Sequence, residues 1–319
     1  MAIDIHKITT FTDFVLQQEH HKSHSGNLTL LLEQIARAGK IIGSHVRESG
    51  LVDILGKTGR KNSFSEEVQK LDEYSNELLI KTLTNSGQTY ALISEELPEP
   101  FFPDKEYEGN FVVFFDPLDG SSNIDTNGPV GTIFSIYEKT DSSLLQTGTK
   151  QIAAGYILYG ASIMLVLSLG TGVYGFTLDP MIGSFLLSHP NIQIPENGTT
   201  YSLNEAYMPY YEETTQKYLN HLKQQEKMSS RYIGAMVADI HRILLKGGIF
   251  LYPKDKKHPE GKLRLTIEVN PLSFLVEQAG GKSFAAKGSP LDILPHHIHE
   301  RTPIVLGSKK LVNAYISFL

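Results

Sequence analysis

The stretch FVVFFDPLDGSSN, residues 111–123, decides the fold and the chemistry of this chain. It begins with an uninterrupted apolar run, which is typical of a strand buried on both faces of a sheet. The run ends in a turn in which Asp116 and Asp119 can bracket a hard cation. The backbone carbonyl of Leu118, between them, can supply a further oxygen ligand. The stretch therefore predicts a buried strand that delivers a metal-binding turn.

A second acidic pair follows another strand-like run, TYALIS (89–94), as Glu95 and Glu96. Carboxylates at two strand ends can converge on one point, where bound cations clamp a phosphoryl group during in-line displacement. Gly120-Ser121-Ser122 adds successive N–H groups, a nest of phosphate size. A DPLD turn by itself is equally well a solvated acidic turn, because such turns are common. In combination, these features favour a metal-phosphate site.

Composition narrows the class of protein. The chain has 319 residues, and 29 Lys and Arg against 35 Asp and Glu give a net charge of −6. This acidic balance argues against a nucleic-acid binder held by bulk charge, so phosphate must be caught by local cations or N–H groups. There is no Cys, which excludes disulfides, thiolate nucleophiles and Cys-ligated metals.

Two segments bear on localisation. The first 25 residues mix charged and polar residues without an apolar core, so no signal peptide is predicted and the cytoplasm is the expected compartment. Residues 151–178 carry no charge, and an uncharged run of this length can signal a membrane-spanning helix. Five glycines interrupt it. We therefore expect a short buried helix followed by two interior strands.

The remaining pattern predicts mixed sheets and helices in layers, with a domain boundary near residues 190–200. Ser63-Phe64-Ser65-Glu66 fits a capping box, and the helix that follows it carries Asp72 near its apolar stripe. The Gly- and Lys-rich residues 50–62 predict a loop. The other predicted helices are 28–48, 211–228, 234–246 and 271–281, and the other predicted strands are 130–137, 249–252 and 263–268.

SEEL (94–97) and DPLDGSSNID (116–125) together resemble the lithium-sensitive, Mg²⁺-dependent sugar phosphatase superfamily. Over about residues 10–319 the chain is similar to class I fructose-1,6-bisphosphatase. The inositol monophosphatase branch uses a Trp-Asp motif, and this chain has no Trp. The resemblance implies an α/β sugar phosphatase fold of alternating helix and mixed-sheet layers (αβαβα), in two domains, 1–195 and 196–319. The segments that carry the likeness to class I are QKLDEYSNELL (69–79), VGTIFSIY (130–137), AAGYILYG (153–160), YSLNEAY (201–207), RYIGAMVADIHRILLKGGIFLYP (231–253) and GKLRLTIEVNP (261–271).

The resemblance also implies roles for individual residues. Asp72 and Glu96 would orient or deprotonate the attacking water. The bound ion would be Mg²⁺, with Mn²⁺ and Zn²⁺ as alternatives. Arg231 would reach the site of a neighbouring subunit in a homotetramer, and Gly50–Asn62 would be the family's dynamic loop. The implied metal ligands are Glu95, Glu96, Asp116, the Leu118 carbonyl, Asp119 and Glu268. The implied substrate-binding residues are Asp119, Gly120, Ser121, Ser122, Asn204, Tyr207, Arg231, Tyr232, Tyr252, Lys262 and Arg264, the last assisting beside the sugar and its second phosphate.

The reaction that the resemblance implies is hydrolysis of the 1-phosphate of fructose 1,6-bisphosphate, in gluconeogenesis. Positioning and charge stabilisation account for most of the catalysis of phosphoryl transfer. Two alternatives stay open. A sedoheptulose-1,7-bisphosphatase would use the same residues, and a catalytically silent metabolite sensor would keep the pocket without turnover.

A second binding region is less well matched. Ser25, Gly26, Asn27 and Thr29 resemble the helix-start part of the AMP site in vertebrate members of the family. Elsewhere the pattern departs: Asn110-Phe111 stands where the family has Lys-Tyr, and Glu138 stands where it has Arg. The loss of two cations and the gain of an acid should weaken binding of a nucleotide phosphate. We therefore expect AMP to inhibit weakly, if at all.

Overall fold

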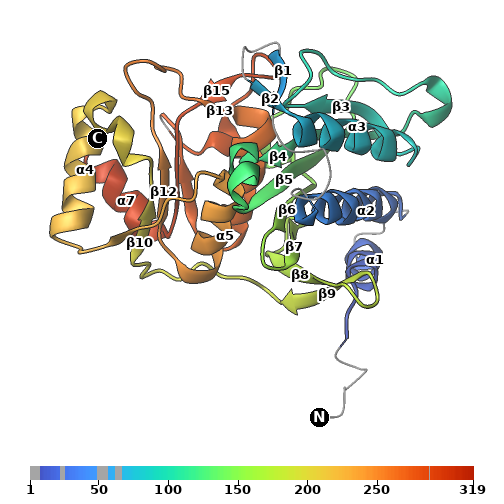
Figure 1. The fold of residues 1–319 in the computed structure, drawn as a ribbon, viewed down its shortest axis with the longest axis horizontal. Coiled ribbons are helices and arrows are strands. Elements are labelled where there is room, and N and C mark those ends of the chain that lie inside the picture. The colour runs from blue at the N-terminus through green and yellow to red at the C-terminus, as the bar shows by residue number, and fades with distance from the viewer. Residues whose placement is uncertain (1–7, 22–25, 49–56, 62–66, 287) are drawn as a thin grey trace.

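The computed structural model describes residues 8–21, 26–48, 57–61, 67–286 and 288–319. The described residues form five layers, helix, sheet, helix, sheet, helix, as the family resemblance implies (Figure 1). Three buried apolar clusters hold adjacent layers together, because each sheet buries apolar side chains on both of its faces.

The larger sheet has seven strands that lie side by side in chain order. The first two strands are parallel, and each later pair is antiparallel. Phe111–Phe115 is buried throughout, as predicted for a strand that is covered on both faces. The seven strands are β3 (Thr89–Ser94), β4 (Phe111–Asp119), β5 (Val130–Glu138), β6 (Ala153–Tyr159), β7 (Ile163–Ser168), β8 (Tyr174–Asp179) and β9 (Ser184–His189).

Three helices cover one face of this sheet: α1 (Phe11–His21), α2 (Asn27–Arg47) and α3 (Lys70–Thr84) (Figure 1). The predicted helix over 28–48 is confirmed as α2. Its buried apolar residues recur at helical spacing and pack on the sheet, so the hydrophobic pattern predicted both the helix and its inner face.

The second sheet has five strands in the order β11-β10-β12-β16-β14. Helices α5 (Met236–Lys246) and α6 (Asn270–Gln278) lie between the two sheets, and α4 (Glu213–Gln224) and α7 (Lys309–Ser317) cover the outer face (Figure 1). The strands of this second sheet are β10 (Thr200–Ser202), β11 (Ser229–Ser230), β12 (Ile249–Tyr252), β14 (Lys282–Phe284) and β16 (Ile304–Gly307). Smaller elements are β1 (Lys57–Lys61), β2 (Glu67–Gln69), β13 (Leu263–Arg264), β15 (Arg301–Thr302), the 3-10 helices η2 (Lys105–Tyr107), η3 (Ser121–Thr126), η4 (Gly148–Lys150), η5 (Glu205–Tyr210) and η7 (Pro290–Asp292), and the π-helical turn η6 (Leu265–Val269).

The uncharged run 151–178, all of which the structure describes, contains no helix, and the predicted buried helix is wrong. The run forms β6, β7 and β8 instead. Gly155 lies where a Cβ atom would be 2.5 Å from the Val166 carbonyl oxygen and 2.6 Å from the Phe134 ring, so this glycine allows close packing within the sheet. Of all the described helices, none combines the length and the apolar character needed to cross a membrane.

Two other boundaries differ from the prediction. The predicted strand 263–268 is a strand only at Leu263–Arg264, and Leu265–Val269 forms a π-helical turn. The predicted capping box at 63–66 lies outside the described residues, and the helix begins at Lys70. Most of the predicted loop 50–62 also lies outside them, and its described part, Lys57–Lys61, pairs with β2.

Phe176 tests the packing of α1 on the sheet. Its ring is fully buried in β8 and lies 5.1 Å from the ring of Phe11 and 5.3 Å from that of Phe14, centroid to centroid. Phe176→Ala should lower the free energy of unfolding by roughly 3–5 kcal/mol, because it removes buried area and leaves a cavity. The same change at Phe102, which is 51% exposed, should cost at most about 1 kcal/mol. Denaturant titration compares the two, and equal losses would contradict this packing.

Candidate active site

Three acids meet between the carboxyl end of β4 and the π-helical turn. One carboxylate oxygen from each of Asp116, Asp119 and Glu268 lies within 4.8 Å of the others. Asp116 and Glu268 are buried, and Asp119 is half-buried. Oxygen donors at this spacing suit a hard divalent cation, so the residues present fit the kind of metal ion that the sequence predicts.

A bulge in β4 positions the two aspartates. Asp116 pairs with Ile133 and Asp119 with Gly131, so the pairing register shifts between them. Such a bulge bends the strand and re-aims its side chains. The Leu118 N–H donates to Asp116 Oδ1 at 2.9 Å and fixes the turn.

Asp119 is held from the opposite side by the start of α5. Its Oδ2 accepts the Val237 N–H at 2.6 Å. The positive end of the helix dipole and this N–H group stabilise the negative charge of the carboxylate. The middle helical layer therefore helps to orient a carboxylate that belongs to the neighbouring sheet.

Glu268 depends on the π-helical turn. That turn brings the Arg264 N–H to 2.6 Å from Glu268 Oε2. Isolated π-turns occur frequently at functional sites. The buried guanidinium of Arg264 bonds to Glu95 and lies 3.9 Å from Glu268. Arg264 thus pairs with acids of the cluster, and the role beside the sugar and its second phosphate that the resemblance implies for it stays a prediction.

The acids raise one another's pKa values. Burial, followed by repulsion from Glu95, Asp119 and Glu268, raises the pKa of Asp116 well above its usual value.

Burial also raises the pKa of Asp119 to about 7, although the Val237 N–H opposes the change. For Glu268, burial and Glu95 raise the pKa to about 8 against the charge of Arg264. A bound cation would offset both the cost of burying negative charge and the repulsion between the acids. Binding of a cation would therefore stabilise the deprotonated cluster.

Hydrogen bonds of Ser94 connect helix α3 to the turn that carries Glu95 and Glu96. The Ser94 hydroxyl donates to Asn76 Oδ1 at 2.6 Å and accepts the Glu96 N–H at 3.2 Å. Asp72, buried in the first turn of α3, lies one helical turn before Asn76. The sequence analysis missed Asn76 and Ser94. Two features of the sequence could have revealed them: Asn76 lies four residues after Asp72, on the same side of the helix, and Ser94 immediately precedes Glu95 and Glu96.

The predicted phosphate nest follows β4 directly. Gly120 has φ = 77°, and a Cβ atom there would lie 2.3 Å from the Ala235 Cβ. Only glycine satisfies both the left-handed backbone and this close approach to α5. Ser121 and Ser122 start the 3-10 helix that follows. The nest thus lies beside Asp119 at the start of α5.

The residues predicted to bind the sugar form a tyrosine-rich group. The Asn204 side chain lies close enough to Tyr232 to lower the pKa of its hydroxyl, against the effect of burial. The Lys262 Nζ lies 4.2 Å from the centroid of the Tyr207 ring. Burial raises the pKa of Tyr232 and of Tyr252, and Asp119 adds to the effect on the former and Glu268 to that on the latter. The tyrosines therefore lie near the acids.

The segment that carries Tyr232 depends on an acid that the sequence analysis missed. Asp239 of α5 is buried, and both of its oxygens accept the Ile233 N–H at 3.2 Å. The sequence feature that could have revealed Asp239 is the position of an acid on the apolar face of the predicted helix 234–246. Arg231, one residue before Tyr232, is exposed and donates to the Ser230 carbonyl.

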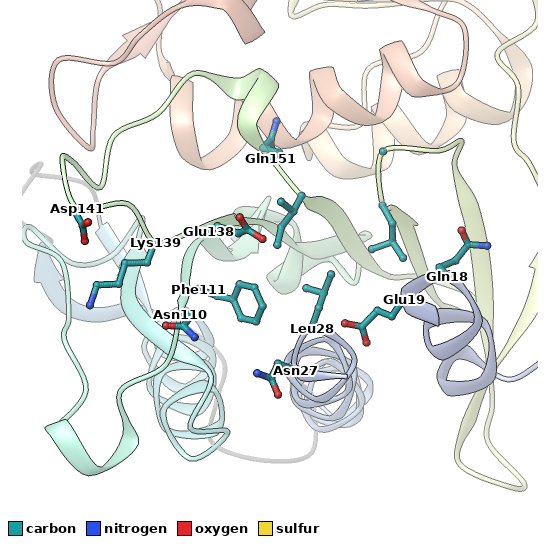
Figure 2. Close-up of a pocket in the computed structure, with 13 residues that line it drawn as sticks. Gln18, Glu19, Asn27, Leu28, Asn110, Phe111, Glu138, Lys139, Asp141 and Gln151 are labelled. Carbon is teal, nitrogen blue, oxygen red and sulfur yellow. The ribbon is translucent and has the colours of Figure 1, made fainter. Parts of the chain in front are cut away.

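A separate cavity of about 710 Å³ lies between α1, α2 and the ends of β4 and β5 (Figure 2). Of the predicted effector residues, Asn27 lines it, Gly26 precedes α2 with φ = 82°, and Thr29 is buried. Ser25 lies outside the described residues. The substituted residues Asn110, Phe111 and Glu138 line the cavity too, so these departures from the family pattern meet in one place.

The layered fold, with carboxylates beside a phosphate-sized nest, defines a phosphatase, an enzyme that hydrolyses phosphate esters. Family models described as "Fructose-1-6-bisphosphatase, N-terminal domain" and "Fructose-1-6-bisphosphatase, C-terminal domain" match residues 9–190 and 194–319. The chain belongs to the fructose-1,6-bisphosphatase family.

Individual relatives agree over nearly the whole chain. A class 1 fructose-1,6-bisphosphatase of Persephonella marina is 51% identical, over 96% of this chain and 97% of its own length. A cytosolic fructose-1,6-bisphosphatase of Arabidopsis thaliana is 48% identical, over 96% and 94%. The crystal structure of Leishmania major fructose-1,6-bisphosphatase in holo form superposes with a TM-score of 0.92, at 39% identity and 98% coverage of both chains.

The raised pKa values predict how stability depends on pH. Between about pH 4 and about pH 8 the folded protein holds protons on Asp119 and Glu268 that the unfolded chain, with pKa values of 3.8 and 4.5, has lost. This contribution is full below the unfolded pKa values and disappears as pH rises to the folded pKa values of about 7 and about 8. In a chelating buffer the free energy of unfolding should therefore fall from about pH 4 to about pH 8 and level off above that.

Added Mg²⁺ should reverse that trend, because deprotonated carboxylates bind the cation more tightly. Denaturant titrations at several pH values, with Mg²⁺ and with chelator, measure both effects. Glu268→Gln serves as the control and should flatten the dependence in chelator. A stability that rises with pH in chelator would contradict the assignment.

Proposed function

We propose that this chain hydrolyses the 1-phosphate of fructose 1,6-bisphosphate and releases fructose 6-phosphate and phosphate, as a step of gluconeogenesis. One observation carries the proposal: three acids converge beside the Gly120-Ser121-Ser122 nest. Such a site joins a cation-binding cluster to a phosphate cradle, as phosphoryl transfer requires. The relatives named fructose-1,6-bisphosphatase support the choice of sugar phosphate.

In this proposal the nest receives the phosphate to be cleaved. Its N–H groups and the two serine hydroxyls would donate to the phosphoryl oxygens. The tyrosine-rich group would hold the sugar, with Asn204 and Lys262 contributing polar contacts, and Arg231 would complete the site of a neighbouring subunit. Neutral donors that surround a sugar fix its orientation without holding the product too tightly.

The acids would hold Mg²⁺, with Mn²⁺ and Zn²⁺ as alternatives, through the side chains of Glu95, Glu96, Asp116, Asp119 and Glu268 and the Leu118 carbonyl. When bound, such ions stabilise charge on the phosphoryl and leaving oxygens. Asp72 and Glu96 would orient the attacking water and accept its proton. The Asn76–Ser94 bond supports this pairing, because it ties α3 to the turn that carries Glu96.

A sedoheptulose-1,7-bisphosphatase stays the alternative, because the same nest and acids would serve it. Side-by-side turnover of the two bisphosphates decides between them. A silent metabolite sensor would bind sugar phosphate without releasing phosphate.

We further propose that the protein is a homotetramer in the cytoplasm.

We also propose two domains, residues 1–195 and 196–319. The separate matches of the two family models support this division, as do the two main sheets, because each sheet falls within one of the two segments.

Asp119 gives the direct test. Asp119→Asn keeps an acceptor for the Val237 N–H but removes the charge, so the fold should survive while phosphate release falls at least about a hundredfold. Asp125→Asn changes an exposed acid in the 3-10 helix η3, which follows Asp119; it is the matched control and should leave activity unchanged. Phosphate release from fructose 1,6-bisphosphate and thermal unfolding measure the two properties. Full activity of Asp119→Asn would refute the proposed metal site.

For AMP we expect little or no inhibition. Glu138 lies in the cavity where the family pattern has Arg, and Glu19 already accepts the Thr29 N–H at the start of α2. A nucleotide phosphate would meet repulsion from both acids. Initial rates measured over a range of AMP concentrations test this expectation, and inhibition at micromolar AMP would contradict it.

A further inference from the structure

Two buried hydroxyl groups from neighbouring strands lead to the turn that carries the clustered aspartates. Thr132 of β5 is 1% exposed, and Tyr159 of β6 is 2% exposed. The Thr132 hydroxyl donates to the Pro117 carbonyl at 2.8 Å. The hydroxyl oxygens of Thr132 and Tyr159 are also 2.8 Å apart. These hydrogen bonds cross three adjacent strands of the large sheet and end in the bulge of β4.

The register of the sheet explains why Thr132 reaches this carbonyl. The pairing of β4 with β5 shifts between Asp116 and Asp119, so Thr132 is the single residue of β5 opposite Pro117 and Leu118. A bulge of this kind disrupts the local ladder of backbone hydrogen bonds. The Thr132 hydroxyl therefore holds β4 at the point where the sheet's own ladder is disrupted.

The direction of donation follows from the number of hydrogens. A carbonyl oxygen only accepts, and the single hydroxyl hydrogen of Thr132 goes to Pro117. The hydrogen between the two hydroxyl oxygens must therefore come from Tyr159. Burial raises the pKa of Tyr159, so the phenol keeps the proton that it donates.

The peptide group between Pro117 and Leu118 extends the series to Asp116. Its carbonyl accepts from Thr132, and its N–H group donates to Asp116 Oδ1 at 2.9 Å. Side chains therefore hold both ends of one planar group, and a rotation of that plane would weaken both bonds. Hydrogen bonds in series strengthen one another, and every member here donates toward the carboxylate.

Helix α2 restricts the first member of the series. The Tyr159 ring belongs to the apolar cluster between the helices and the sheet, and a Cβ atom at Gly43 of α2 would lie 3.0 Å from its Cδ1. The glycine thus lets the helix pack directly against the ring. Because the ring is confined in this way, its hydroxyl stays directed at Thr132.

We propose that Tyr159 and Thr132 are positioning residues whose hydroxyl groups, acting in series through the Pro117–Leu118 peptide group, hold Asp116 in the orientation that binds Mg²⁺. This inference rests on the metal site of the proposed function. It adds two residues outside the acidic cluster that set the affinity of that site. Removal of a group that orients a metal ligand typically weakens metal binding by roughly 10- to 100-fold.

Calorimetric titration with Mg²⁺ in the absence of substrate tests the proposal without any measurement of turnover. Thr132→Val keeps the shape of the side chain and removes the hydroxyl, so it should weaken Mg²⁺ binding about tenfold. Thr132→Ser keeps the hydroxyl and should restore most of the affinity. Tyr159→Phe should weaken binding less, by about threefold, because Thr132 still holds the carbonyl.

The serial arrangement gives a second readout. In a Thr132→Val background, Tyr159→Phe should cause no further loss of Mg²⁺ affinity, because its donor has lost the hydroxyl that accepts from it. Two losses that multiply in the double variant would show independent effects and overturn the proposal. Tyr159→Phe removes one oxygen atom only, so it decides the question even if Thr132→Val does not fold. Unchanged Mg²⁺ affinity in Tyr159→Phe would reject the proposal.

A second buried Thr–Tyr pair provides the matched control. The hydroxyl oxygens of Thr215 in α4 and Tyr315 in α7 lie 3.2 Å apart in the outer helical layer. Thr215→Val should lower the unfolding temperature about as much as Thr132→Val and leave Mg²⁺ affinity unchanged. Equal losses of affinity in the two variants would overturn the proposal, as would unchanged affinity in Thr132→Val. If the unaltered protein bound no Mg²⁺, the metal site of the proposed function would be refuted as well.

Discussion

The mutual repulsion of buried carboxylates is the constraint on which the rest of this structure depends. Asp116, Asp119 and Glu268 bring negative charge within 4.8 Å in a buried place, at a cost that shows in their raised pKa values. Backbone N–H groups and Arg264 offset part of that cost. A site of this kind binds a divalent cation strongly because the protein has already assembled the oxygen ligands against their own repulsion.

Three adjacent layers contribute restraints to that assembly: the large sheet and the helices on its two faces. The bulge in β4 sets the two aspartates, the start of α5 holds one of them, and the π-helical turn before α6 presents the glutamate. On the other face, α3 is tied to the β3 turn through Asn76 and Ser94. These three layers thus hold the site from several sides, as a preorganised active site requires.

The starts of two helices in this chain hold a carboxylate of the chain itself. At α5 the carboxylate is Asp119, which belongs to the cation-binding cluster. At α2 it is Glu19, which lines a cavity without a free cation among its described residues. The same interaction therefore occurs at two places: it orients an acid of the cluster, and it puts a carboxylate at the start of α2 beside the second cavity.

The sequence by itself determined the strands at 89–94 and 249–252, the amphipathic helix α2 and the family, and it singled out the three acids that lie together in the structure. These features are local, because hydrophobic period and short motifs are set by neighbouring residues. Only the tertiary structure decided that the first part of the glycine-rich run forms strand β6 and not the predicted helix, since burial on both faces removes the alternation that marks a strand. It also decided the partners of Arg264 and Glu95, 169 positions apart, and of Glu19, because such contacts exist only after distant segments have packed together.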